Sequence, residues 1–261
     1  RTAVDLMDRG DARSLADHLE RHPGLTGIRV ELGTEDYFAS PYLLSFIAEN
    51  PVRYGRVPET VLDVLDVLIA AGSGTEALNE TLALVSSGRV MRESGRQGAV
   101  IARLCDAGAD PDVALLTALG HGEFGAVKAL IQAGAAKTLP WAASIGDLEA
   151  TDQLLSKASQ LERHQALALA ATHGQTAPLE RLLAAGEDPN RFNPPGCHAH
   201  TTPLHQAAWF GHLDVVKALV EAGARTDIPD KSHGGPALGW AQHGGQPHVE
   251  AYLASLNQQE P

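Results

Sequence analysis

The segment Thr202–Ala224 restricts the fold more than any other stretch of the sequence, because it encodes two short antiparallel helices. Thr202 can cap the first helix, and Pro203 takes its first position, where a missing N–H costs nothing. Gly211 allows the chain to reverse, and Gly223 is placed for a left-handed stop after the second helix. An apolar stripe along the second helix is formed by Leu213, Val215, Val216 and Leu219. The segment therefore predicts a helix pair that shares a core with its neighbours.

Weaker copies of this helix pair precede and follow it, which indicates a repeat architecture. The copies cover residues 115–135, 139–155, 166–190 and 236–256. Glycines at the helix reversals, Gly122, Gly146, Gly174, Gly211 and Gly245, follow one another at steps of 24, 28, 37 and 34 residues. The repeat is therefore irregular in length.

The pattern from Thr202 to Ala224, TPLHQAAWFGHLDVVKALVEAGA, resembles the ankyrin repeat. This resemblance implies stacked helix pairs joined by β-hairpin fingers, with about 33 residues per repeat. Steps of 24 and 28 residues leave no room for a finger, so we expect tight turns in the middle of the chain. Between Asn190 and Thr202 the chain is longer than the family pattern, and we expect an enlarged finger there.

We therefore predict an all-α fold, a solenoid of about eight stacked antiparallel helix pairs in which some repeats are shortened and lack the finger. Abundant Ala and Leu with only 5% aromatic residues favour helices over strands. We expect a single domain over residues 1–261, with degenerate N-terminal helix pairs in 1–110 and recognisable repeats in 111–261.

Charge and hydropathy exclude several classes of partner. With 32 acidic and 20 basic residues the net charge is −12, which disfavours nucleic acid and anionic membranes. The longest apolar run is about six residues, against the roughly 20 of a membrane-spanning helix. Cys105 and Cys197 offer neither a disulfide framework nor a CxxC pair, so a reducing, cytoplasmic location is expected.

Seven of the 12 histidines lie between His198 and His248. The resemblance explains two of them: it implies that His205 bonds the hydroxyl of the preceding Thr, and that His212 packs after the turn. His198 and His200 lie in the enlarged finger, where no family motif requires them. If that finger is extended, the His-x-His spacing presents both imidazoles on one side. The alternative is a solvated loop that happens to contain two histidines.

Further polar and aromatic residues fall at equivalent places in the last two repeats. Asp230 and His233 belong to the next finger, and Trp209, Trp240 and His243 belong to the inner helices. Because successive repeats stack, we predict one ligand-binding site lined by His198, His200, Trp209, Asp230, His233, Trp240 and His243. The alternative for Trp240 is that it only fills space near the C-terminal end.

Two functions are compatible with these residues. The first, implied by the resemblance, is a scaffold that binds a protein or peptide, favoured if basic, through its concave face and fingers. The second is a small-molecule or metal site, with an acid–base or metal-assisted enzyme as one form of it. Its catalytic groups would be His198, His200, Asp230 and His233. The sequence contains no HExxH, GxSxG or GxxxxGK[ST] motif, so it does not identify a cofactor.

Overall fold

The computed structural model describes residues 2–33, 35 and 37–257, and these fold into helices. They contain no β-strand, apart from an isolated antiparallel bridge between Arg29 and Tyr42. The chain divides into two compact units, Arg1–Ala136 and Lys137–Pro261. The predicted all-α fold is confirmed.

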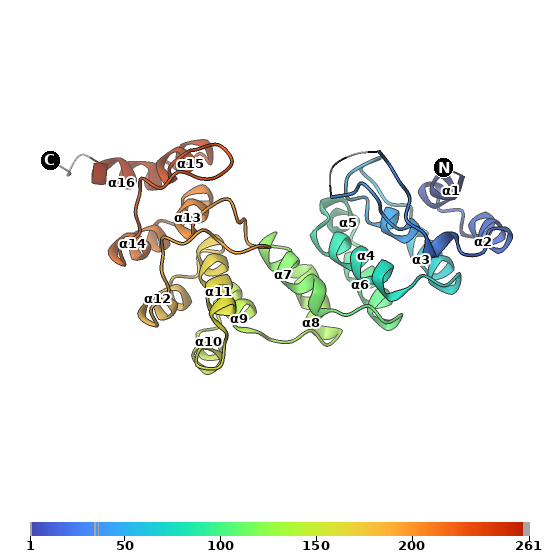
Figure 1. Ribbon diagram of the computed structural model, residues 1–261, viewed down its shortest axis with the longest axis horizontal. Coiled ribbons are helices and arrows are strands. Elements are labelled where there is room, and N and C mark those ends of the chain that lie inside the picture. Colours follow the sequence, from blue (N-terminus) through green and yellow to red (C-terminus); the bar gives the residue numbers. More distant parts are fainter. Residues whose placement is uncertain (1, 34, 36, 258–261) are drawn as a thin grey trace. The chain divides into compact units, whose positions relative to one another are not determined.

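The second unit is a two-layered stack of four helix pairs (Figure 1). Its inner helices are α9 (Leu139–Ile145), α11 (Gln160–Thr172), α13 (Pro203–Phe210) and α15 (Ala237–His243). Its outer helices are α10 (Leu148–Leu155), α12 (Thr176–Ala184), α14 (Leu213–Glu221) and α16 (Pro247–Asn257). Each helix contacts the partner in its own pair and the equivalent helix of the next pair, which is the arrangement of a solenoid.

The first unit also contains four pairs, in a less regular form. The first layer holds α1 (Thr2–Arg9), η2 (Leu43–Ala48), α4 (Thr75–Ser87) and α7 (Asp112–Gly120). The second layer holds α2 (Ala12–Arg21), α3 (Val61–Ala70), α6 (Gln97–Asp106) and α8 (Phe124–Gln132). The short helices η1 (Leu25–Gly27) and α5 (Arg89–Glu93) lie in connections. One of the degenerate N-terminal helix pairs expected in 1–110 therefore begins with a 3₁₀ helix rather than an α-helix.

Local signals set the ends of α13 as the sequence predicted. Thr202 is the N-cap with extended backbone, Pro203 follows it, and the side chains of Thr202 and His205 close a capping box. Gly211 ends the helix at a φ of 78°, a left-handed conformation that a residue with a Cβ rarely adopts. A Cβ at Gly211 would also meet the side chain of Gln246 at 2.1 Å.

The lengths of the connections follow the steps between the turn glycines. Residues 133–138 join α8 to α9, and residues 156–159 join α10 to α11, so neither connection has room for a hairpin. By contrast, residues 185–202 precede α13 and residues 222–236 precede α15. We call these two long connections finger 1 and finger 2.

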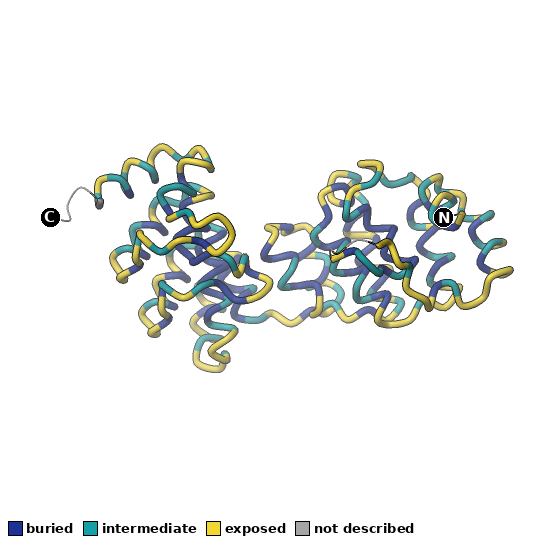
Figure 2. Tube along the Cα trace, turned by 45° about the horizontal axis from the view of Figure 1, so that its top comes forward, coloured by how far each residue is buried: buried dark blue, intermediate teal, exposed yellow. Residues whose placement is uncertain are grey.

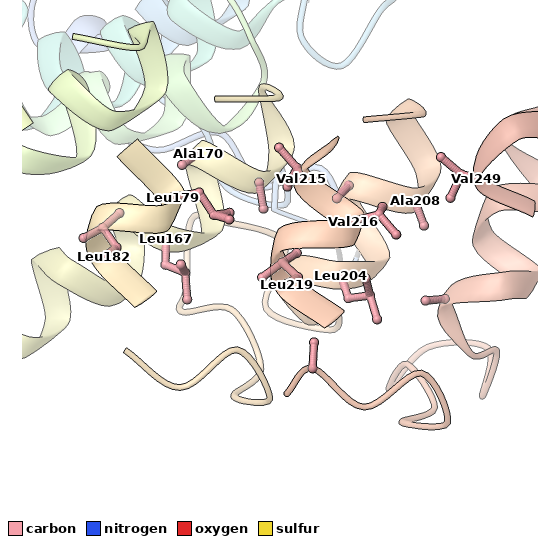
Figure 3. Packing of buried hydrophobic residues seen from close by; sticks show 14 of the residues in the cluster. Leu167, Ala170, Leu179, Leu182, Leu204, Ala208, Val215, Val216, Leu219 and Val249 are labelled. Carbon is pink, nitrogen blue, oxygen red and sulfur yellow. The ribbon is translucent and has the colours of Figure 1, made fainter. Parts of the chain in front are cut away.

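The core of the second unit lies between neighbouring pairs rather than within one pair. Leu204 of α13 and Val216 and Leu219 of α14 are fully buried, in one cluster with Leu167 and Leu182 of the preceding pair and Val249 of the following one (Figure 3). Figure 2 shows that buried residues follow the helices and exposed residues collect at the turns and connections. The sequence placed the apolar stripe correctly, although Leu213 is only partly buried.

The single domain over 1–261, with degenerate helix pairs in 1–110 and recognisable repeats in 111–261, stays a prediction. The contacts within the chain group around a boundary after Ala136 instead. Within the described residues, no helix combines the length and the apolar character that crossing a bilayer requires. Cys105 and Cys197 are both free thiols.

Replacing Leu219 by Ala should lower the free energy of unfolding by about 2–5 kcal/mol, because it leaves a cavity in the shared core. Urea denaturation of the purified chain measures this. The exposed Leu161 offers a matched control, since Leu161→Ala removes the same atoms from the surface. Equal denaturation midpoints for the two variants would show that Leu219 is not a core residue.

Candidate functional site

The two fingers lie side by side and are joined by hydrogen bonds at both ends. At the base, the Asn190 side chain donates to the Gly223 carbonyl at 3.0 Å and accepts from the Arg225 amide at 2.8 Å. Further out, the Lys231 amide donates to the His200 carbonyl at 2.8 Å. The stacking of neighbouring fingers that the repeat predicted is therefore present, and Asn190 is a bridging residue that sequence reasoning missed.

Finger 1 is not the extended segment that the His-x-His spacing suggested. It turns twice, with the Cys197 amide donating to the Pro194 carbonyl and the Thr201 amide to the His198 carbonyl, each at 3.0 Å. His198 itself has a φ of 60°, in the left-handed region. The imidazoles of His198 and His200 nevertheless lie close, with ring centroids 6.2 Å apart. The turn, rather than strand alternation, brings them together.

Cys197, which directly precedes His198 in finger 1, is not accessible as a nucleophile because it is buried. Its side chain is 1% exposed, and burial raises the pKa of its thiol to about 12. At neutral pH the group is therefore an un-ionised thiol packed inside finger 1.

Asp230 is the residue that organises finger 2. Its carboxylate is buried and accepts four hydrogen bonds, from the amides of Ser232, His233 and Gly235 at 2.8 Å each and from the Trp240 indole N–H at 3.1 Å. Burial acts to raise the pKa of this carboxyl, but these donors outweigh it and hold the pKa well below its usual range. In the structure Asp230 therefore holds the loop and the Trp240 ring.

His205 links the start of α13 to finger 2. Its Nδ1 lies 2.8 Å from the Thr202 hydroxyl and 3.2 Å from the Thr202 amide, and its Nε2 lies 3.2 Å from the Gly235 carbonyl. These partners fit a neutral ring that accepts at Nδ1 and donates at Nε2. Burial lowers the pKa of His205, which favours the same neutral form. The bond to the Thr hydroxyl that the resemblance implied is present.

An aromatic cluster forms the floor between α13 and α15. The rings of Trp209 and Trp240 meet edge to face with centroids 5.5 Å apart, and the His200 ring lies 5.8 Å from that of Trp240. The His243 ring faces Trp209 at 6.5 Å and 27°. Gly244 permits this approach of the two helices, because a Cβ there would meet the Trp209 carbonyl oxygen at 2.4 Å.

These groups surround a cavity of about 570 Å³, which we call the aromatic cavity. All seven residues predicted for the ligand site line it, so the structure brings the whole predicted set together. The lining residues are His198, His200, Gln206, Trp209, Phe210, Asp230, His233, Gly235, Gly239, Trp240 and His243. Phe210 was missed, although its place directly before the turn glycine, next to Trp209, could have identified it. The roles of these residues in ligand binding or catalysis stay predictions.

The arrangement is poorly suited to a metal. Among the described residues, no group of three or more His, Cys, Asp or Glu side chains is placed to hold a metal ion. Asp230 could not add a ligand without losing a donor, because both of its oxygens already accept two hydrogen bonds.

Replacing Asp230 by Asn should destabilise the protein by about 1–3 kcal/mol, because the amide NH₂ would face backbone donors. The near-UV circular dichroism of the tryptophans should weaken as Trp240 loses its partner. Asp227→Asn is the control, since Asp227 is an exposed finger 2 carboxylate paired with Arg225. Equal stability of the two variants in urea would contradict the organising role of Asp230.

The stability of the protein should fall as the pH drops below about 6.5, because unfolded imidazoles take up protons before the buried His205 does. His164, whose pKa burial also lowers, acts in the same direction. His205→Gln should show a smaller change in the free energy of unfolding between about pH 7.5 and pH 5 than the wild type. The exposed His248→Gln variant should keep the wild-type pH dependence; a His205→Gln variant that also keeps it would refute this assignment.

Comparison with known proteins identifies the repeats. A family model described as ankyrin repeats, in three copies, matches residues 139–230. The chain is 33% identical over 116 aligned positions to bovine cyclin-dependent kinase 4 inhibitor B, covering 33% of this chain and 88% of that protein. It is 28% identical over 208 positions to the ankyrin repeat and KH domain-containing protein mask-1 of Caenorhabditis elegans, covering 73% of this chain.

A third relative is the putative E3 ubiquitin-protein ligase XBAT31 of Arabidopsis thaliana, 31% identical over 108 positions and 41% of this chain. The chain spans only 8% of the length of mask-1 and 23% of the length of XBAT31. The layered helix pairs, the matched repeats and the coverage of the bovine relative lead to one conclusion: the chain belongs to the ankyrin-repeat family.

Proposed function

We propose that this chain is a protein-interaction scaffold that binds a peptide segment of its partner in the aromatic cavity. The observation that carries the proposal is the exposure of large aromatic side chains there: Trp209 is 36% exposed and Phe210 is 47% exposed. Aromatic side chains gathered in a concavity are typical anchors of protein interfaces, because they bury a large area at a small cost in conformational entropy.

The walls of the cavity favour binding because they are already ordered. Finger 2 is held by the hydrogen bonds to Asp230, and finger 1 is tied to it through Asn190 and the His200 carbonyl. Binding of a partner therefore costs little free energy for ordering the site. The ankyrin repeats themselves support the scaffold class of function. The name of the bovine relative, a kinase inhibitor, describes a protein that acts on another protein, in agreement with that class.

A small-molecule ligand is the second candidate, and the size of the cavity favours it. About 570 Å³ falls within the range of small-molecule sites, about 300–1,000 Å³. The enzymatic form of this candidate depends on His198, His200 and His233, since Asp230 has no oxygen lone pair to spare. Both candidate functions are compatible with the cytoplasmic location expected from the sequence, and that location stays a prediction.

A selection of phage-displayed random peptides on the purified chain tests the scaffold. Selected peptides should bind the wild type, and Trp209→Ala should weaken them about 30-fold, the effect of losing an anchor worth about 2 kcal/mol. Isothermal titration calorimetry measures the affinities. His200→Ala combined with His233→Ala should also weaken binding while leaving the urea midpoint nearly unchanged, because these rings lie on the fingers outside the core.

The control variant is Ile145→Ala. Ile145 is exposed and directly precedes a turn glycine, as Phe210 does, but it lies on α9 and does not line the cavity. Its loss should leave peptide affinity unchanged. Peptides that bind Trp209→Ala as tightly as the wild type would exclude the aromatic cavity as the binding site. A screen of a small-molecule library by thermal shift, with the same variants, tests the second candidate.

A further inference from the structure

The charges around the aromatic cavity are one-sided. Its lining includes one carboxylate, that of Asp230, and no Lys or Arg. With histidines counted as neutral, the whole chain carries −12. A positively charged group therefore enters the cavity without meeting a like charge, and the surrounding field attracts it.

Two of the three tryptophans, Trp209 and Trp240, line this cavity. The Trp240 N–H, the positive edge of that indole, is occupied by the Asp230 carboxylate at 3.1 Å. Trp209 stands at 66° to Trp240, so the two indoles form a corner, and Phe210 adds a half-exposed phenyl ring beside it. The faces of aromatic rings carry the negative part of the quadrupole and attract cations, with Trp the strongest.

Elsewhere in the chain, cations already lie over aromatic rings. Lys137 lies 5.3 Å from the ring centroid of Trp141, and Lys231 lies 4.0 Å from that of Phe192. In the part of the chain that the structure describes, no such cation lies over Trp209 or Trp240. Of the two tryptophans in the cavity, Trp209 keeps 36% of its surface exposed, which leaves room for a cation from a partner.

Because the cavity has no carboxylate that a ligand can reach, it should prefer a guanidinium to a primary ammonium. The Asp230 side chain is 0% exposed and its oxygens are saturated, so it cannot replace the water shell of a primary ammonium. A guanidinium is planar, more weakly hydrated and stacks on aromatic faces. Trp209 lines the cavity and is 36% exposed, so it offers an aromatic surface for a flat group of this kind.

We propose that the group recognised in the aromatic cavity is a weakly hydrated cation, the arginine side chain of a bound peptide. This inference rests on the proposed peptide-binding function and specifies the chemistry of the residue that the cavity takes. The primary ammonium of lysine and an uncharged group of nearly the same shape as arginine are the competing occupants, and the experiment distinguishes them.

The test uses the full chain labelled with ¹⁵N and three capped pentapeptides, Gly-Gly-X-Gly-Gly, in which X is arginine, lysine or citrulline. Citrulline has nearly the shape of arginine but no charge. The arginine peptide should shift the indole N–H resonances of Trp209 and Trp240 and leave that of Trp141, which already carries Lys137, unchanged. The citrulline and lysine peptides should bind at least about tenfold more weakly.

Trp209→Ala should reduce binding of the arginine peptide by about tenfold or more, and Ile145→Ala should leave it unchanged. Assignment of the indole resonances follows from the Trp→Phe variants. Binding of citrulline or lysine equal to that of arginine overturns the proposal, and so does an equal shift of Trp141, which would indicate general attraction to an acidic surface.

Failure of this inference is distinguishable from failure of the proposed function. Selected peptides that need Trp209 but contain no arginine, or that bind equally after arginine is replaced by citrulline, leave the scaffold intact and refute the arginine site. If the arginine pentapeptide binds the cavity while no selected peptide does, the cation site stands and the peptide-binding scaffold fails.

Discussion

A helix pair in this chain can bury its apolar stripe only against the next pair, and the other features of the second unit depend on this constraint. Leu204, Val216 and Leu219 are buried in a cluster that includes residues of the pairs on both sides. Pairs must therefore stack in register, with inner helices beside inner helices and outer beside outer. Register in turn places equivalent residues of successive repeats next to each other, which is how residues far apart in sequence come to share one cavity.

Because the repeats stack, the two fingers place polar and aromatic side chains on one shared surface. Asp230 closes finger 2 on itself and holds the Trp240 ring through the indole N–H, while His205 connects the Gly235 carbonyl to the cap of α13. A buried carboxylate with four donors is stable in its charged form, so the loop does not need a partner to become ordered. The result is a rigid loop with an aromatic ring presented at its base.

Much of the fold could be predicted from the sequence, because the residues that set the helix ends act locally. Thr202, Pro203, Gly211 and Gly223 each act on their own helix ends, and the steps between turn glycines predicted which connections are short. The grouping of the seven site residues followed from repeat register alone. The left-handed turn at His198 and the saturation of Asp230 were not predicted, because both depend on contacts that a spacing pattern does not contain. Phe210 was missed because apolar residues next to turns are usually read as core.

Repeat length also explains where the site lies. A wall of the aromatic cavity requires two long connections side by side, and residues 185–202 and 222–236 meet that requirement. The connection at 156–159 is too short to form a finger, so α11 has no companion wall on that side. The bonds from Asn190 to Gly223 and Arg225 then hold the two fingers at one spacing. The irregular repeat lengths, which depart from the family pattern, are therefore what confine the aromatic cavity to the last two repeats.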